Sequence, residues 1–165
     1  MFEEKLSSAT KILHIVSSGW VLILACIICV DVIGRAFFNS PLLGTAEIVK
    51  NSVVAITFLQ VPLAIMIGAM LRTSIILDSV GPRIRSAIEI LACLLGVIFF
   101  VALAVGSFEP LIDAWKIGEY EGEGALRVPT YPVRAVVFVM AILSAIVFAW
   151  QIVRIFSGKP HTVEN

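Results

Sequence analysis

Four long stretches without Asp, Glu, Lys or Arg constrain this chain more than any other feature of its sequence. They cover residues 12–30, 51–71, 90–108 and 135–153 and are 19 to 21 residues long. A helix of about 20 residues crosses the hydrocarbon core of a bilayer, at a rise of about 1.5 Å per residue. Such a helix satisfies its own backbone hydrogen bonds in lipid, and the stretches are too long and too uniformly apolar for barrel strands. The sequence therefore predicts an all-α integral membrane protein.

The composition supports a lipid environment. Of the 165 residues, 59% are hydrophobic and 15% are charged, whereas soluble domains are about 45–50% apolar and roughly 25% charged. Lys plus Arg and Asp plus Glu each total 12, so there is no basic excess to neutralise phosphate backbones. We therefore expect membrane lipids, and no nucleic acid, among the partners.

The expected organisation is one domain, residues 1–156, followed by a cytoplasmic tail at 157–165. Four transmembrane helices form one bundle, with spans at approximately 12–34, 47–71, 87–108 and 133–155. No A-x-A-like cleavage site follows the first apolar stretch, so we interpret it as a retained span and not as a secretion signal.

Basic residues near the span ends predict the orientation, because cytoplasmic segments carry the excess of Lys and Arg. Seven such residues lie in the N-terminal segment, the 72–89 connection and the tail, against five on the other side. We therefore expect both termini in the cytoplasm and the acidic 109–134 connection outside.

Turn-forming residues mark the connections. The sequence N-S-P at 39–41 and Gly44 end one helix, and Thr45 is expected to cap the next. Pro82 is placed to open the third span. That helix is expected to project beyond the bilayer, and prolines are expected to extend the segment 128–132.

Polar groups within the four stretches are few. For Gln60, next to a kink at Pro62, an interhelical hydrogen bond is favoured over a ligand site. The three cysteines, Cys26, Cys29 and Cys93, lie within spans and are interpreted as packing residues. We expect no catalytic residue, no metal and no cofactor. Small residues four apart, such as Ala92 and Gly96, predict close helix packing.

Three charged residues cluster at the end of the first span. Asp31 and Arg35 are four apart, hence on one helical face and able to pair. Glu47 is expected in the first turn of the next helix, where the helix dipole favours it and where it can reach Arg35. Two interpretations stay open: a solvated anchor at the span ends, or an ion-pair clamp that fixes the first hairpin or docks another subunit.

Several motifs together carry a family resemblance. They are G-R-A-F-F-N-S-P at 34–41, Glu47 six residues later, L-R-T-S-I at 71–75, G-P-R-I-R at 81–85 and L-R-V-P-T-Y-P-V-R at 126–134. In order and spacing the chain resembles the small, DctQ-like membrane subunit of tripartite ATP-independent periplasmic (TRAP) transporters, from the first span to Arg154. It departs from the family where Thr73 and Ser74 follow Arg72, because a histidine often stands there.

The resemblance implies a three-part uptake system in the bacterial inner membrane. A periplasmic binding protein captures an organic anion, such as a carboxylate or sulfonate, and a large elevator-type subunit imports it with the sodium gradient. This chain would be its non-enzymatic scaffold. Asp31, Arg35, Glu47 and Arg72 are the expected structural ion-pair or subunit-interface residues. The residues expected to contact the binding protein are Glu119, Glu121, Glu123 and Arg127.

Two other classes of function remain as alternatives. A disulfide-forming membrane redox enzyme requires cysteine pairs in its outer loops, and here all three cysteines lie within spans. A self-contained, oligomeric small exporter requires a membrane-embedded acidic residue, for which Glu47 is the nearest candidate.

Overall fold

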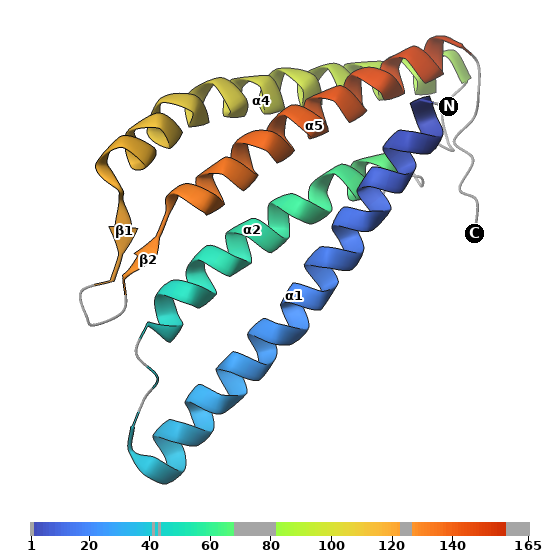
Figure 1. The fold of residues 1–165 in the computed structure, drawn as a ribbon. Coiled ribbons are helices and arrows are strands. Elements are labelled where there is room, and N and C mark those ends of the chain that lie inside the picture. The colour runs from blue at the N-terminus through green and yellow to red at the C-terminus, as the bar shows by residue number, and fades with distance from the viewer. Residues whose placement is uncertain (1, 41, 43, 68–81, 123–126, 158–165) are drawn as a thin grey trace.

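In the part of the chain that the computed structural model describes, there are four long helices and a short β-hairpin (Figure 1). The structure describes all residues except 1, 41, 43, 68–81, 123–126 and 158–165. Arg72, Glu123 and nearly all of the expected tail lie outside the described residues. The helices are α1 (Phe2–Phe38), α2 (Thr45–Met66), α4 (Pro82–Ile117) and α5 (Tyr131–Phe156), and the strands are β1 (Tyr120–Glu121) and β2 (Val128–Pro129).

Each of the four helices is long and apolar enough to cross a membrane. The prediction of four apolar helices is therefore confirmed. Three of them extend beyond the expected spans at both ends: α1 has 37 residues, α4 has 36 and α5 has 26. Successive helices run in opposite directions, so the start of α1 and the end of α5 lie at the same end of the molecule (Figure 1). Which side of the membrane this end occupies stays a prediction.

The connection between α1 and α2 is built from local backbone geometry. Asn39 has a positive φ of 46°, and the Ser40 N–H donates to the Gly34 carbonyl at 3.2 Å. The N-terminal cap of α2 is Gly44, with φ of 80°. The expectation that Thr45 caps this helix is wrong: Thr45 is the first helical residue, and its hydroxyl donates back to the Leu42 carbonyl at 3.1 Å. Glycine takes the cap position because the chain turns there through a left-handed conformation.

The described part of the α4–α5 connection contains two short strands, where an irregular loop was expected. As predicted, α4 begins at Pro82, and it continues past Pro110 to Ile117. The two strands then pair antiparallel, with Tyr120 opposite Pro129 and Glu121 opposite Val128. The extended segment ends at Pro129 and not at residue 132, because Pro132 lies in the first turn of α5, where a proline suits a helix.

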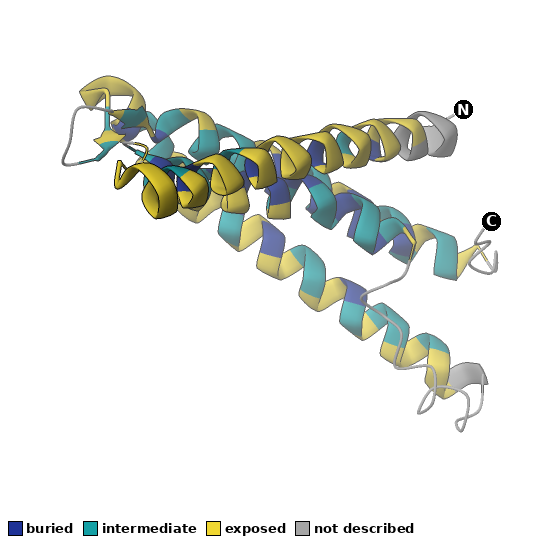
Figure 2. Cartoon of the chain, turned by 90° about the horizontal axis from the view of Figure 1, so that it is seen from below, coloured by how far each residue is buried: buried dark blue, intermediate teal, exposed yellow. Residues whose placement is uncertain are grey.

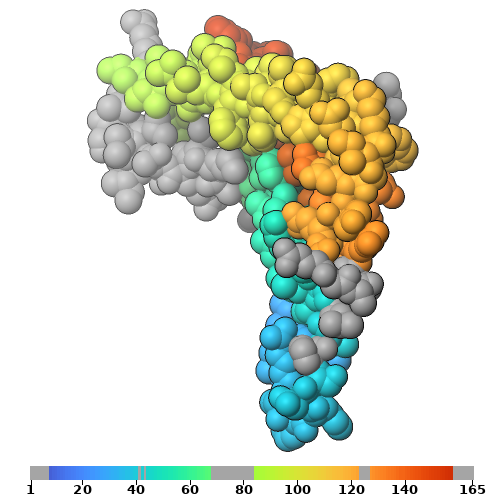
Figure 3. Space-filling model, turned by 90° about the vertical axis from the view of Figure 1, so that its left-hand side faces the viewer, coloured from blue at the N-terminus to red at the C-terminus, as the bar shows by residue number. Residues whose placement is uncertain are grey.

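The four described helices lie in a row, in the order α4, α5, α2, α1 (Figure 1). Neighbours in this row pack against each other. In Figure 3, α4 and α5 form one block from which α2 and α1 extend. The hydrophobic core explains the open shape, since its buried residues come from α2, α4 and α5: Ile65, Cys93, Phe100, Ala104, Ala141, Val147 and Phe148.

Helix α1 joins the row through one narrow seam. From Ser8 onward, where burial is described, its buried residues are Thr10, Ser17, Leu24 and Asp31, spaced seven apart. Such a repeat keeps one stripe of a helix on its partner. Three of the four are small or polar, which lets α1 approach α2 closely. In the most apolar window of α1, 11% of residues are buried, against 33% in α2 and in α5. Exposed residues cover most of α1 in Figure 2.

Candidate functional site at the hairpin end

Charged side chains gather where the β-hairpin and the α1–α2 connection lie, which we call the hairpin end. The first group is centred on Asp31. One of its carboxylate oxygens accepts from Arg35 Nε at 2.8 Å and the other accepts from the Leu42 N–H, also at 2.8 Å. The Asp31 side chain is 9% exposed and that of Arg35 is 58% exposed. Asp31 therefore ties the last turns of α1 to the connection that leads into α2.

Glu47 lies in the first turn of α2, where it was expected. Within the described residues, however, the structure contains no ion pair between Glu47 and Arg35. Arg35 turns back along its own helix to Asp31, because the four-residue spacing places the two side chains side by side. Glu47 instead lines a shallow cavity of about 320 Å³ with Lys50, Glu121 and Gly122.

The second charged group attaches the β-hairpin to the helices. Glu121 accepts from Lys50 Nζ of α2 at 2.7 Å and from Asn51 Nδ2 at 3.5 Å. Immediately before β1, Glu119 pairs with α5: Arg134 Nη2 lies 2.9 Å from both carboxylate oxygens of Glu119. These contacts join segments up to 71 residues apart, which is why the sequence alone did not indicate them.

Further bonds complete the hairpin. Arg134 Nη1 donates to the Pro110 carbonyl of α4 at 3.3 Å. The Thr130 N–H donates to the Glu119 carbonyl at 3.1 Å. The Arg127 guanidinium lies over the Tyr120 ring, 4.5 Å from its centroid. Of the residues expected to contact a binding protein, Glu119, Glu121 and Arg127 thus all have partners within the chain.

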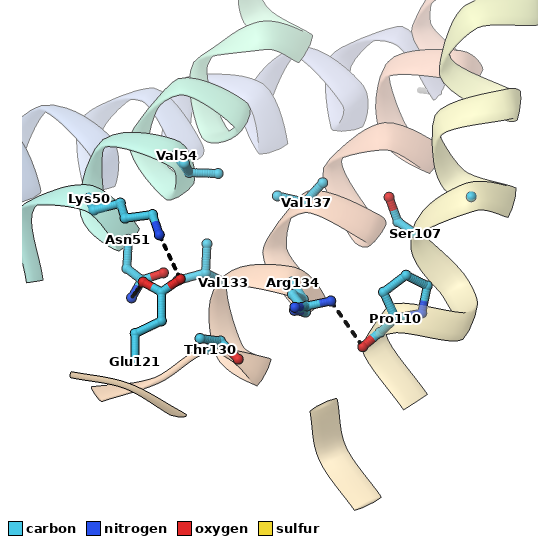
Figure 4. Close-up of a pocket in the computed structure, with 11 residues that line it drawn as sticks. Lys50, Asn51, Val54, Ser107, Pro110, Glu121, Thr130, Val133, Arg134 and Val137 are labelled. Atoms are coloured by element: carbon cyan, nitrogen blue, oxygen red, sulfur yellow. Dashed lines mark hydrogen bonds and ion pairs between the residues drawn. The ribbon is translucent and has the colours of Figure 1, made fainter. Parts of the chain in front are cut away.

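A cavity of about 310 Å³ lies beneath these contacts, between α2, α4 and α5 (Figure 4). Each helix contributes three residues, spaced i, i+1 and i+4, so that they share one helical face. The lining residues are Lys50, Asn51 and Val54 of α2, Gly106, Ser107 and Pro110 of α4, Val133, Arg134 and Val137 of α5, and Glu121 and Thr130 of the hairpin.

Buried polar side chains at the opposite end of the helices link three of them. Gln151 of α5 donates to the Ile65 carbonyl of α2, and the Cys93 thiol of α4 contacts the Gln151 amide oxygen at 3.6 Å. Gln151 was not singled out from the sequence, although it is a lone amide in an apolar helix. Gln60 was singled out from the sequence. It is half-buried, and the described structure records no side-chain hydrogen bond for it.

Within the described residues, no group of three or more His, Cys, Asp or Glu side chains is placed to hold a metal ion. The charged side chains described above bind one another and backbone groups across segment boundaries. Their geometry joins the hairpin to α2, α4 and α5, and it leaves a cavity with a charged rim. These contacts hold the hairpin against the helices, and the cavity with its charged rim is a candidate binding surface.

The fold and this site define a multi-pass helical membrane protein whose charged groups gather at one end of the spans. The sequence profile of one family, described as tripartite ATP-independent periplasmic transporters, DctQ component, matches residues 24–158. The chain therefore belongs to the DctQ family, a transporter component and not an enzyme family. The resemblance drawn from the motifs is confirmed. A search of curated proteins found no match.

Proposed function

We propose that this chain is the scaffold subunit of a sodium-driven, binding-protein-dependent transporter that imports an organic anion, a carboxylate or sulfonate, across the bacterial inner membrane. It has no catalytic role. It packs on a large elevator-type subunit and widens the part of the complex that stays fixed in lipid, so that the transport domain moves relative to it. A periplasmic binding protein delivers the solute.

The observation that carries this proposal is the open row of helices. The two edge helices, α1 and α4, bury only 11% of their most apolar windows within the chain. Large apolar side chains on them are exposed, among them Leu22 of α1 and Leu95 of α4, at 69% and 59%. Contiguous apolar surface of this kind suits a lipid or protein neighbour in the membrane. An open row with two uncovered edges can lie along a larger membrane subunit.

The small number of polar groups within the spans also favours a scaffold role. Transporters that couple to ions keep ionisable groups or broken helices near the middle of the bilayer. Here the four long apolar stretches contain no Asp, Glu, Lys or Arg. The deeply buried amide of Gln151 is occupied by a helix carbonyl.

Affinity purification of the tagged chain from mild-detergent extracts of native membranes tests the proposal. We expect a strongly hydrophobic partner in stoichiometric amount. Recovery of the chain alone would contradict the scaffold proposal. Recovery of a homo-oligomer would also contradict it and would make Glu47 the candidate ion site of a small exporter. Leu22→Gln and Leu95→Gln, on opposite edges of the row, then identify the docking edge by which of them releases the partner.

The contact with the binding protein belongs to the same proposal. The hairpin end would face the periplasm if both termini are cytoplasmic. Replacing Glu119, Glu121 and Glu123 together by Ala should reduce uptake by the reconstituted complex. Because Glu121 also pairs with Lys50 and Glu119 with Arg134, Lys50→Gln together with Arg134→Gln is the matched control: it breaks the same two ion pairs and leaves the loop acids in place. Unchanged uptake in the triple variant would contradict the proposal that these acidic residues contact the binding protein.

A further inference from the structure

We infer that the cavity at the hairpin end binds one phospholipid molecule, with its phosphate at the charged rim and the start of an acyl chain on the apolar floor. This goes beyond the scaffold proposal and does not depend on which solute is transported. The argument rests on the depth of each lining residue, on the donors at the rim and on the aromatic residues beside it.

The cavity changes from polar to apolar along the helix axes. Helices α2 and α5 run away from the hairpin end, so Val54 and Val137 lie deeper in the cavity than Lys50 and Arg134. Helix α4 runs toward that end, so Gly106 lies deeper than Pro110. In Figure 4, Val54 and Val137 lie on the side of the charged residues that faces away from the strands. A ligand that fills this space must itself be polar at one end and apolar at the other.

The rim offers more donors than the chain uses. The Lys50 ammonium has three N–H donors, and the described structure records one ion-pair partner for it, Glu121. The Arg134 guanidinium has five N–H donors, with bonds recorded to Glu119 and Pro110. Ser107 adds a hydroxyl group to the lining, whereas the Thr130 hydroxyl already donates to the Glu119 carbonyl at 3.3 Å. Lysine and arginine with further donors are suited to a phosphate group.

An aromatic pair that includes Tyr131, next to Thr130 in the chain, supports a position of the rim at the headgroup level. Trp115 and Tyr131, at the end of α4 and the start of α5, pack edge to face with ring centroids 5.1 Å apart. Aromatic belts of Trp and Tyr mark the headgroup level of a bilayer. The volume of about 310 Å³ lies at the lower end of ordinary ligand pockets, enough for a headgroup and part of one chain. A free anion would leave the apolar floor unused.

The test uses the full chain, together with any partner that co-purifies, analysed by native mass spectrometry with added phosphatidylglycerol. Gly106→Leu fills the floor without touching an ion pair, because a side chain there enters open space. Gly19→Leu on α1 is the matched control, since its position is also open and lies outside the cavity. We expect one tightly retained phosphatidylglycerol per wild-type chain, binding about tenfold weaker in Gly106→Leu, and no change in Gly19→Leu.

Measurements on the wild-type chain complement the variants. Dioleoylglycerol, which lacks the phosphate, should be retained at least about tenfold less well. Glycerol phosphate, which lacks the chains, should not displace the lipid. Equal retention of dioleoylglycerol, equal binding by Gly106→Leu, or displacement by glycerol phosphate would each overturn the proposal. If Gly106→Leu released a protein partner while lipid retention stayed unchanged, the occupant would be that partner and the lipid proposal would again be wrong.

Discussion

Gly96 of α4 lies directly against the ring of Phe148 in α5: a methyl group at Gly96 would come within 2.8 Å of Phe148 Cζ. The ring is buried and also packs on Phe100, with centroids 5.8 Å apart. Helices α4 and α5 therefore touch where α4 has no side chain. This is the close helix packing that the sequence predicted at Gly96.

Replacing Gly96 by Ala should destabilise the α4–α5 pair, because the buried Phe148 ring has to move. Overpacking of a buried contact costs about 1–3 kcal/mol, and we expect a loss of folding free energy in that range. Loss of helical circular dichroism on titration with a denaturing detergent measures it. The control is Gly19→Ala, where the added methyl meets nothing within 4 Å; equal losses in both variants would contradict the packing argument.

Asp31→Ala should cost more stability than Arg35→Ala. Removing the carboxylate leaves both Arg35 and the Leu42 N–H without their acceptor, a loss of about 1–3 kcal/mol. Removing Arg35, which is largely exposed, leaves the Leu42 bond in place and should cost less than about 1 kcal/mol. The same detergent titration ranks the two variants. If Arg35→Ala also leaves complex yield and uptake intact, Arg35 is only an interfacial anchor.

Breaking the Lys50–Glu121 pair should loosen the hairpin with little change in global stability. The two side chains are 69% and 32% exposed, and exposed pairs contribute about 0–1 kcal/mol. In Lys50→Gln and Glu121→Gln we expect faster hydrogen exchange at the Thr130 amide, which bonds to Glu119. The double reversal Lys50→Glu with Glu121→Lys should restore slow exchange. An amide that exchanges alike in all variants argues that the strand pairing holds the hairpin unaided.

Gln151→Leu should weaken the contact between α5 and α2. The Ile65 carbonyl loses a side-chain donor, and hydrogen bonds of this kind within membranes contribute about 0.6 kcal/mol, up to about 1.7. Gln60→Leu is the matched control, because the described structure gives that amide no side-chain partner. Stability of the two variants is compared by the same titration, and a larger loss for Gln60→Leu would reverse the assignment.

Local features of this protein followed from the sequence because they depend on short-range rules. The four apolar stretches predicted four helices, since backbone groups in lipid must be satisfied within the segment. Pro82 marked the start of α4, and the spacing of Asp31 and Arg35 brings them together in an ion pair. The motifs between residues 34 and 134 were sufficient to indicate the DctQ family, whose profile covers residues 24–158.

Tertiary structure decided the rest. Side chains that face lipid and side chains that face a neighbouring helix are equally apolar, so the sequence did not reveal the row α4, α5, α2, α1. It also did not reveal the pairing of Lys50 with Glu121 or of Gln151 with Ile65, which lie 71 and 86 residues apart. Which polar groups meet depends on how the helices pack, and that is set by shape at contacts such as Gly96 with Phe148.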